Sequence, residues 1–152
     1  MKTLVVYFSK TGNTRKIAKE ISKKLNSDLD EITEMKKRGF FGKWISGGSE
    51  SMKGKTSKIT YKKDPKNYDL IILGGPIWAW HLIPPIRAYL EQNKENMKKL
   101  AFFVTLLGSE GSSFDEVGKY KKLTASMRVT NKNMKNSNYE KELNAFCSKL
   151  KH

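Results

Sequence analysis

The sequence predicts an α/β fold in which a doubly wound, five-stranded parallel sheet carries helices on both faces. Three runs of apolar and β-branched residues, at 4–8, 68–75 and 100–107, have the composition of strands buried on both faces. A helical pattern follows each run, and this alternation of strand and helix is typical of parallel sheets. The 152 residues suit a single domain, 1–152, that is large enough to bury a core.

The first part of the chain contains a clear helix, a weak strand and a segment of mixed character. A helix beginning at Thr14 is predicted by apolar residues at helical spacing: Ile17, Ala18, Ile21 and Leu25. Residues 28–33 predict a strand at the edge of the sheet, because few of them are apolar. Residues 35–58 are rich in Gly, Lys and Ser with scattered aromatic residues. They predict a loose helix packed on the sheet, and the alternative is a surface for nucleic acid or a membrane.

Cap and turn signals mark the elements of the second part. Pro84 and Pro85 are consecutive and open a predicted helix, in the first turn where proline is tolerated. The pattern Ser-x-x-Glu occurs at 113–116 and at 137–140, and this spacing predicts a capping box at the start of each following helix. Apolar and polar residues alternate over 123–129, which predicts a half-solvated fifth strand.

The net charge of +15 is concentrated in two segments. Residues 35–66 hold ten Lys or Arg and two acidic residues, and residues 118–152 hold nine and two. Such a basic surface favours acidic partners or non-specific attraction to nucleic acid. The alternative is a lysine-biased composition without a role in binding, since nearly all the positive charges are Lys.

Membrane, disulfide and metal signals are weak. No apolar run reaches the length of a membrane span, and the chain starts directly on a predicted strand rather than a signal peptide, so a cytoplasmic protein is expected. Cys147 is the only cysteine, so an intrachain disulfide is excluded. Its helical spacing from Leu143, Phe146 and Leu150 predicts a buried thiol rather than a redox-active one.

The turn between the first strand and the first helix, SKTGNT at 9–14, has the character of a phosphate-binding site. Gly12 lets the backbone tighten, and Asn13 or Thr14 is expected to cap the helix. The first N–H groups of the helix then point into the turn at the positive end of the helix dipole. Neither G-x-x-x-x-G-K-[ST] nor G-x-G-x-x-G is present, which favours a terminal monophosphate over a nucleoside triphosphate or a dinucleotide. The alternative is an ordinary capped connection.

Three loops are expected to meet at the carboxyl ends of the strands, which is where doubly wound sheets bind ligands. They are the turn at 9–14, a loop with two tryptophans at 76–81 and a glycine-containing loop at 105–111. A phosphate site beside aromatic residues and glycines predicts a flat aromatic ligand that carries one phosphate. FMN fits this description.

With these motifs, the sequence resembles the flavodoxin family over essentially its whole length. The matching stretches are YFSKTGNT, YDLIILGGPIW and FFVTLLGSEGSSF. The resemblance implies the strand order 2-1-3-4-5 and noncovalent FMN. By the same resemblance, the residues that hold the phosphate are Ser9, Lys10, Thr11, Gly12, Asn13 and Thr14. Those that contact the isoalloxazine ring are Pro76, Ile77, Trp78, Ala79, Leu107, Gly108, Ser109 and Gly111.

The chain departs from the family pattern in three ways. Well-known flavodoxins are acidic, whereas this chain is basic. The loop at 105–111, the second of the two loops expected to contact the flavin, has no tyrosine. This leaves Trp78 or Trp80 as the aromatic cover of the flavin. The loop at 76–81 has no glycine, although a peptide of this loop turns in the family when the flavin takes up one electron. Because that turn is easiest at glycine, the sequence predicts two-electron rather than one-electron behaviour.

These observations favour a soluble FMN protein that carries electrons between redox protein partners, which the basic charge predicts to be acidic. The alternative is an NAD(P)H-dependent quinone or FMN reductase of the same fold. A third hypothesis is a basic module that binds a polyanion and has no redox role, and nucleic acid is the less favoured partner. His81 is interpreted as a surface-loop histidine rather than a flavin contact. No catalytic or metal-binding set of residues is recognised.

Overall fold

The computed structural model describes residues 1–35 and 57–151. Within these residues, five strands pair in parallel in the order β2-β1-β5-β7-β8, which confirms the predicted order 2-1-3-4-5. The helix expected within 35–58 falls on residues 36–56 and so lies outside the described part of the chain. The five strands are β1 (Thr3–Tyr7), β2 (Asp28–Glu31), β5 (Leu70–Trp78), β7 (Leu100–Leu106) and β8 (Leu123–Thr130).

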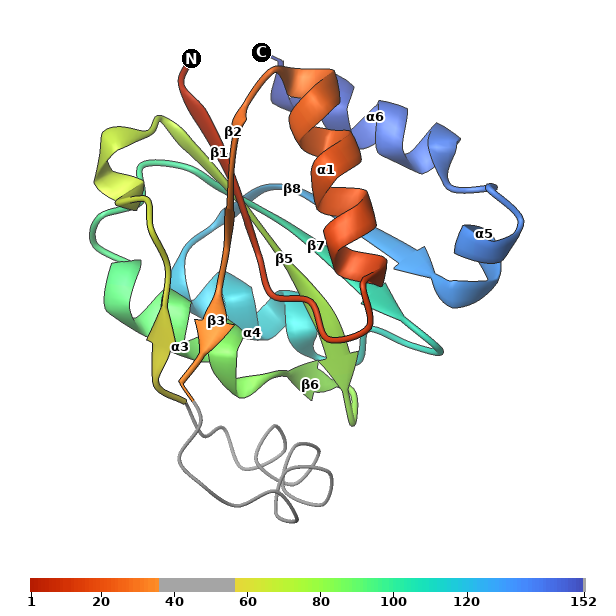
Figure 1. The fold of residues 1–152 in the computed structure, drawn as a ribbon, viewed down its shortest axis with the longest axis horizontal. Coiled ribbons are helices and arrows are strands. Elements are labelled where there is room, and N and C mark those ends of the chain that lie inside the picture. Colours follow the sequence, from red (N-terminus) through yellow and green to blue (C-terminus); the bar gives the residue numbers. More distant parts are fainter. Residues whose placement is uncertain (36–56, 152) are drawn as a thin grey trace.

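Helices cover both faces of this sheet, as predicted (Figure 1). On one face lie α1 (Asn13–Leu25) and α6 (Glu140–Leu150), and on the other lie α3 (Pro84–Asn93) and α4 (Ser113–Tyr120). The shorter helices are α5 (Asn131–Lys135) and a 3-10 turn, η1 (Pro65–Asn67).

Alternation along the central strands divides the core into two layers. On β1, Leu4 and Val6 pack on the side of α3 and α4, whereas Val5 and Tyr7 pack on the side of α1 and α6. All four side chains are buried, as expected for a strand covered on both faces. On β8 only every second residue is buried, which confirms the half-solvated strand.

Two predicted features of the helices are confirmed. Proline occupies the first turn of α3, which begins at Pro84. Cys147 is buried in the layer beneath α6, and burial raises the pKa of its thiol, so it remains protonated at neutral pH. Among the described residues, no helix combines the length and the apolar composition that crossing a lipid bilayer requires.

Both predicted capping boxes are wrong. Helix α4 is preceded by Ser112 rather than capped by Ser113, whose hydroxyl is buried without a hydrogen-bond partner among the described residues. Helix α6 begins at Glu140 behind Tyr139, and no side chain caps it. In α4 the glutamate of the pattern, Glu116, binds other side chains instead of the backbone. A four-residue pattern cannot detect this competition, because His81 and Arg87 come from distant parts of the chain and Ser112 lies just outside the pattern.

Three two-residue strands were not predicted, because so short a segment carries no periodic pattern. β3 (Thr33–Glu34) and β4 (Ile59–Thr60) form an antiparallel pair beside the main sheet. The buried carboxylate of Asp30 accepts the backbone N–H groups of Lys62 and Lys63 at 2.8 and 2.7 Å, and it thereby fixes the chain just after β4. The third strand, β6 (His81–Leu82), turns back antiparallel onto the end of β5.

The edge strand β2 is joined to the centre of the sheet by a side-chain bond. The hydroxyl of Tyr68, just before β5, donates to Asp28 Oδ2 at 2.6 Å. Burial and this hydrogen bond raise the pKa of Tyr68 to about 12. The folded state therefore favours the protonated phenol, and Tyr68 contributes its full share of stability below its unfolded pKa of 10.0.

Replacing Tyr68 with phenylalanine is expected to lower the free energy of unfolding by about 1–2 kcal/mol near neutral pH, because a hydrogen bond to a charged acceptor is lost. The contribution of the wild-type tyrosine disappears as the pH rises from its unfolded pKa through about 12, so the deficit of the variant should shrink over that range. Urea unfolding of both proteins at several pH values measures this. A deficit that stays constant into strong alkali would contradict the assignment.

Candidate functional site

The register of the parallel strands brings the three predicted loops to one edge of the sheet. Tyr7 pairs with Gly74, and Pro76 pairs with Thr105, so β1, β5 and β7 end side by side. The N–H of Phe8 donates to the carbonyl of Gly74 at 3.0 Å, which extends the pairing to the start of the first loop. Figure 1 shows the loops after these strands at the lower end of the sheet.

The turn at 9–14, here called the phosphate turn after its predicted ligand, is closed by glycine rather than by a capping side chain. Gly12 precedes α1 with a φ of 98°, in the left-handed region that favours glycine, and its N–H donates to Ser9 Oγ at 3.1 Å. The expected cap by Asn13 or Thr14 is therefore wrong, because both lie inside the helix. The first turn of α1 has no side-chain cap and no acidic residue. Its N–H groups are thus available to an anion.

The side chains of Asn13 and Thr14 instead tie the turn to neighbouring elements. Thr14 Oγ1 and Thr105 Oγ1 share a buried hydrogen bond of 2.8 Å between α1 and β7. The amide of Asn13 donates to Asn131 Oδ1 at 3.3 Å, at the start of α5. These contacts fix the turn relative to the carboxyl ends of β7 and β8.

A pocket of about 140 Å³ opens between the phosphate turn and the ends of β5 and β7. All of its lining residues are uncharged: Thr11, Asn13, Pro76, Ile77, Trp78, Thr105, Leu106, Leu107 and Asn131. Six of the residues proposed from the sequence are among them: Thr11, Asn13, Pro76, Ile77, Trp78 and Leu107. The others lie outside the lining: Ser9, Lys10, Gly12, Thr14, Ala79, Gly108, Ser109 and Gly111.

Three lining residues were absent from the proposed set. Thr105 and Leu106 are the last residues of β7 on this edge, just before the predicted contacts begin. Asn131 follows β8 directly and opens α5. The rule that ligands bind at the carboxyl ends of the strands would have found it, had the rule been applied to the fifth strand as well.

Trp78, rather than Trp80, lines the pocket. The ammonium of Lys10 lies 4.6 Å from the ring centroid of Trp78, a cation–π distance, and Phe8 meets the same ring edge to face. Trp80 is 63% exposed and Leu107 is 86% exposed, so large apolar surface remains open on these two loops. The lining of the pocket thus includes one aromatic side chain, Trp78, and an exposed aliphatic one, Leu107.

The tryptophan loop is a hairpin with a strained two-residue turn. Trp78 pairs with His81, and the turn residues Ala79 and Trp80 both have positive φ, 49° and 62°. Two positive φ values are typical of a type I′ turn, which usually contains Asn or Gly. Each non-glycine residue there costs roughly 1–2 kcal/mol.

This finding bears on the sequence-based expectation of two-electron chemistry. That expectation required the residues of the loop to avoid the left-handed region until the flavin was reduced. In the structure, Ala79 and Trp80 occupy this region in the protein itself. Part of the conformational cost is therefore already present in the folded state, and the expectation of two-electron behaviour stays a prediction.

Contacts from the glycine-containing loop hold the hairpin turn in place. Gly111 has a φ of 54°, and a Cβ at this position would overlap the carbonyl oxygen of Trp80. The same oxygen accepts the N–H of Ser112 at 3.2 Å. Within the glycine-containing loop, Ser109 Oγ accepts the N–H of Gly111 at 3.1 Å, next to the contact of Gly111 with Trp80. The two predicted flavin loops are thus in direct contact with each other.

Among the described residues, two larger hollows lie away from this edge. One, of about 430 Å³, is at the opposite end of the sheet, near the starts of β7 and β8, and four of its lining residues are lysines: Lys98, Lys99, Lys121 and Lys122. The other, of about 360 Å³, lies beside the end of α3 and is lined mainly by polar residues. Neither includes a residue of the three loops, so neither bears on the predicted site.

Replacing Gly111 with alanine is expected to lower the free energy of unfolding by roughly 1–3 kcal/mol, because the new methyl group meets the Trp80 carbonyl and the residue must keep a positive φ. Gly108 is the matched control, since it lies in the same loop with open space at the Cβ position. G108A should change stability by about 0.5 kcal/mol or less. Chemical denaturation without added flavin compares the two variants, and equal losses would argue against the contact.

Comparison with known proteins places this geometry in one family. Residues 2–150 match the family described as Flavodoxin. A flavoprotein from Lactobacillus acidophilus, solved in complex with FMN, is 27% identical with a TM-score of 0.72, and the match covers 84% of this chain and 92% of that one. A flavoprotein from Bacteroides eggerthii is 28% identical with a TM-score of 0.68, covering 86% and 87%.

More distant structures share the fold over the whole chain. A flavodoxin from Streptococcus pneumoniae is 17% identical with a TM-score of 0.62, and the match covers 99% of this chain and 97% of that one. A comparison with curated protein sequences gives no significant match. The family match covers nearly every residue, and the sheet order and the edge that bears the pocket agree with it. The chain therefore belongs to the flavodoxin family.

Proposed function

We propose that this protein binds FMN noncovalently at the carboxyl edge of its sheet and carries electrons between protein partners. The observation that carries the proposal is the position of the uncapped N-terminus of α1, which opens beside the same pocket that Trp78 lines. The pocket thus combines a site for an anion with a wall for a flat ring. The complex of the Lactobacillus acidophilus flavoprotein with FMN supports this choice of ligand.

The residues at this edge fit the two ends of FMN. A phosphate dianion would be held by the N–H groups of the first turn of α1 and by the hydroxyl of Thr11, without a carboxylate in the pocket lining to repel it. The nearby ammonium of Lys10 adds positive charge on the same side. Charge neutralisation therefore comes mainly from backbone dipoles and one lysine, as in other phosphate sites at helix N-termini.

The isoalloxazine ring would lie against Trp78 and under Leu107. When bound, FMN supplies the capacity to accept and release electrons. The chain's own part is to bury one face of the ring on apolar side chains and to leave its edge open, because Leu107 and Trp80 stand exposed on the loops around the pocket. An accessible edge suits exchange with a protein that docks over these loops.

The charge of the protein supports acidic redox partners. With a net charge of +15, its field attracts negatively charged surfaces and would speed their association at low ionic strength. The NAD(P)H-dependent reductase of the same fold stays the second candidate by family likeness. The absence of glycine from the tryptophan loop is the sequence feature that favours this candidate, and its effect on the redox behaviour stays a prediction.

Replacing Thr11 with alanine is expected to weaken FMN binding by about tenfold or more and to leave riboflavin binding nearly unchanged, because a hydrogen bond to a phosphate is worth about 1.5–3 kcal/mol. Thr11 is exposed and lines the pocket, so the substitution should not disturb the core. Titration of the apoprotein, followed by flavin fluorescence quenching, measures both affinities.

Thr124 provides the matched control for this experiment. It is an exposed threonine on β8 at the opposite end of the sheet, beside the lysine-lined hollow. T124A should bind FMN and riboflavin as the wild type does. If T11A loses affinity equally for both flavins, or if T124A behaves like T11A, the phosphate does not lie at the 9–14 turn.

A separate assay distinguishes the electron carrier from the reductase. The holoprotein should not oxidise NADH or NADPH steadily in the presence of a quinone, but it should accept electrons from a flavin-dependent reductase and pass them to an acidic redox protein. Both reactions are followed by visible spectroscopy. Sustained turnover of a nicotinamide with a quinone would establish the reductase and overturn the carrier.

A further inference from the structure

The strained turn of the β5–β6 hairpin depends on support from outside the hairpin. Ala79 and Trp80 occupy the left-handed region without being glycine, and such conformations persist only where surrounding contacts determine them. The backbone just before α4 supplies one such contact, from the N–H of Ser112 to the carbonyl of Trp80. The side chains supply the rest through four residues, His81, Arg87, Ser112 and Glu116, here called the Glu116 cluster.

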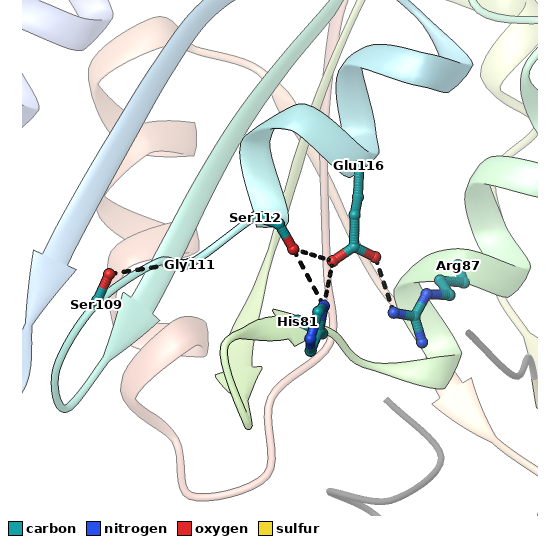
Figure 2. A network of polar contacts seen from close by, with 6 residues as sticks. All are labelled: His81, Arg87, Ser109, Gly111, Ser112 and Glu116. Atoms are coloured by element: carbon teal, nitrogen blue, oxygen red, sulfur yellow. Dashed lines mark hydrogen bonds and ion pairs between the residues drawn. The ribbon is translucent and has the colours of Figure 1, made fainter. Parts of the chain in front are cut away.

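Glu116 is the centre of this cluster. Figure 2 shows its carboxylate between side chains from β6, α3 and the start of α4. One oxygen, Oε1, lies 2.9 Å from His81 Nδ1 and accepts the hydroxyl of Ser112 at 3.0 Å. The other oxygen, Oε2, accepts Arg87 at 2.8 Å. A single carboxylate therefore joins the hairpin, the N-terminus of α4 and helix α3.

Arg87 and Glu116 form the more buried part of the cluster, and His81 forms the more exposed part. The side chain of Arg87 is only 6% exposed and that of Glu116 is 18% exposed, whereas that of His81 is 34% exposed. Burial by itself raises the pKa of Glu116, but hydrogen bonds from Arg87, His81 and Ser112 outweigh this effect and hold the pKa below its usual range. The carboxylate is therefore ionised at neutral pH and acts as a fixed acceptor.

The ionised carboxylate also determines which nitrogen of His81 carries a proton. A carboxylate can only accept hydrogen bonds, so the proton between it and the ring lies on Nδ1 of His81. Ser112 Oγ lies 3.1 Å from the same nitrogen while its own proton points to Glu116. The carboxylate of Glu116 and the hydroxyl of Ser112 thus both approach the same nitrogen of His81, Nδ1.

This geometry does not support a hydrolytic triad, although it contains a serine, a histidine and a glutamate. A triad places its serine and its carboxylate on opposite nitrogens of the imidazole, so that one orients the ring while the other gives up a proton. Here both approach Nδ1, and the serine donates to the carboxylate directly. The cluster can hold His81 in place, but it cannot activate Ser112.

We propose that Glu116 is a positioning residue for the flavin: through His81 and Ser112 it holds the 76–81 hairpin in the conformation that receives the isoalloxazine ring. The inference rests on the proposed function, because it assigns the hairpin to FMN. Trp78 pairs directly with His81 across the hairpin, so a contact at His81 is transmitted to the tryptophan that lines the pocket. The sequence-based interpretation of His81 as a surface-loop histidine gave it no such role, and its side chain is 34% exposed.

The proposal predicts a pattern of flavin binding different from that of a phosphate-site variant. Loosening the hairpin obliges the flavin to order it on binding, which costs affinity for the ring rather than for the phosphate. FMN and riboflavin should therefore lose affinity by the same factor, on the order of tenfold. The visible spectrum of the bound flavin should also shift, because Trp78 no longer holds one orientation beside it.

The test uses three variants of the cluster and one matched control in the full-length protein. H81A removes the contact between His81 and Glu116, and S112A removes the contacts of the Ser112 hydroxyl. Both variants leave the Arg87–Glu116 ion pair intact, whereas E116Q removes the charge of Glu116. Asp115 provides the control, because it is the exposed acidic neighbour of Glu116 on α4 and makes none of the cluster's contacts. D115N changes the net charge by the same amount as E116Q.

The first readout is hydrogen exchange of the amides at 79–82 in the protein without flavin. The proposal expects faster exchange there in H81A and E116Q but not in D115N, with little change in the sheet. Titrations with FMN and riboflavin and the spectrum of bound FMN form the second readout. The double variant H81A/E116Q should lose little more than either single variant, because both act through one contact.

Each result either supports or overturns the inference. Parallel losses for both flavins, with local exchange and a spectral shift, support it. Unchanged exchange at 79–82 and unchanged flavin binding in H81A and S112A overturn it, and these two variants decide the question if E116Q fails to fold. If the wild-type protein binds neither flavin, the proposed function fails and the inference with it. If the wild type binds normally while the variants match D115N, the inference alone fails.

Discussion

The parallel register between β1 and β5 is the constraint on which the rest of the structure depends. It sets Tyr7 opposite Gly74, and the ends of both strands then lie at one edge. Gly74 has no side chain, and a Cβ there would overlap the ring of Phe103 on the neighbouring strand β7. The absence of that one carbon lets a large aromatic residue fill the core layer beneath α1 and α6. Close packing at the centre of the sheet therefore fixes where the phosphate turn and the tryptophan loop meet.

The two loops that this register brings together at the pocket are held in place in different ways. The phosphate turn relies on local geometry: a glycine in the left-handed region, an uncapped helix and a buried hydroxyl pair between Thr14 and Thr105. The tryptophan hairpin relies on long-range contacts, because its turn residues are not suited to their own conformation. Its stability comes from α4 and α3, through Glu116 and Arg87. The part of the site with the less favourable local conformation thus has the more extensive external support.

The charge of the pocket lining differs from that of the protein as a whole. The lining of the pocket contains no charged residue, although the chain as a whole carries a net charge of +15. Lysines gather instead at the opposite end of the sheet, around the hollow formed by Lys98, Lys99, Lys121 and Lys122. A phosphate held by backbone dipoles needs little side-chain charge. In the proposed function, the basic surface would therefore act on association with partners rather than on the cofactor.

The sequence by itself determined the fold and the edge that bears the site. Continuous apolar strands alternating with amphipathic helices leave few arrangements other than a doubly wound sheet, and in such a sheet the carboxyl ends of the strands must converge. The 9–14 turn could be predicted as a phosphate site from its composition, because such a site depends on the backbone of one strand-to-helix connection. These features are local or follow from periodicity, so they are readable without coordinates.

Only the tertiary structure decided how the loops are held. The partners of Glu116 come from 81, 87 and 112, and no spacing in the sequence connects a helix residue to a hairpin that lies 35 positions earlier. The Ser-x-x-Glu pattern at 113–116 predicted a cap and missed this, because the same glutamate had stronger charged and hydrogen-bonded partners in three dimensions. Likewise, the positive φ values of Ala79 and Trp80 contradict their residue types. A conformation imposed by distant contacts against local preference cannot be inferred from local preference.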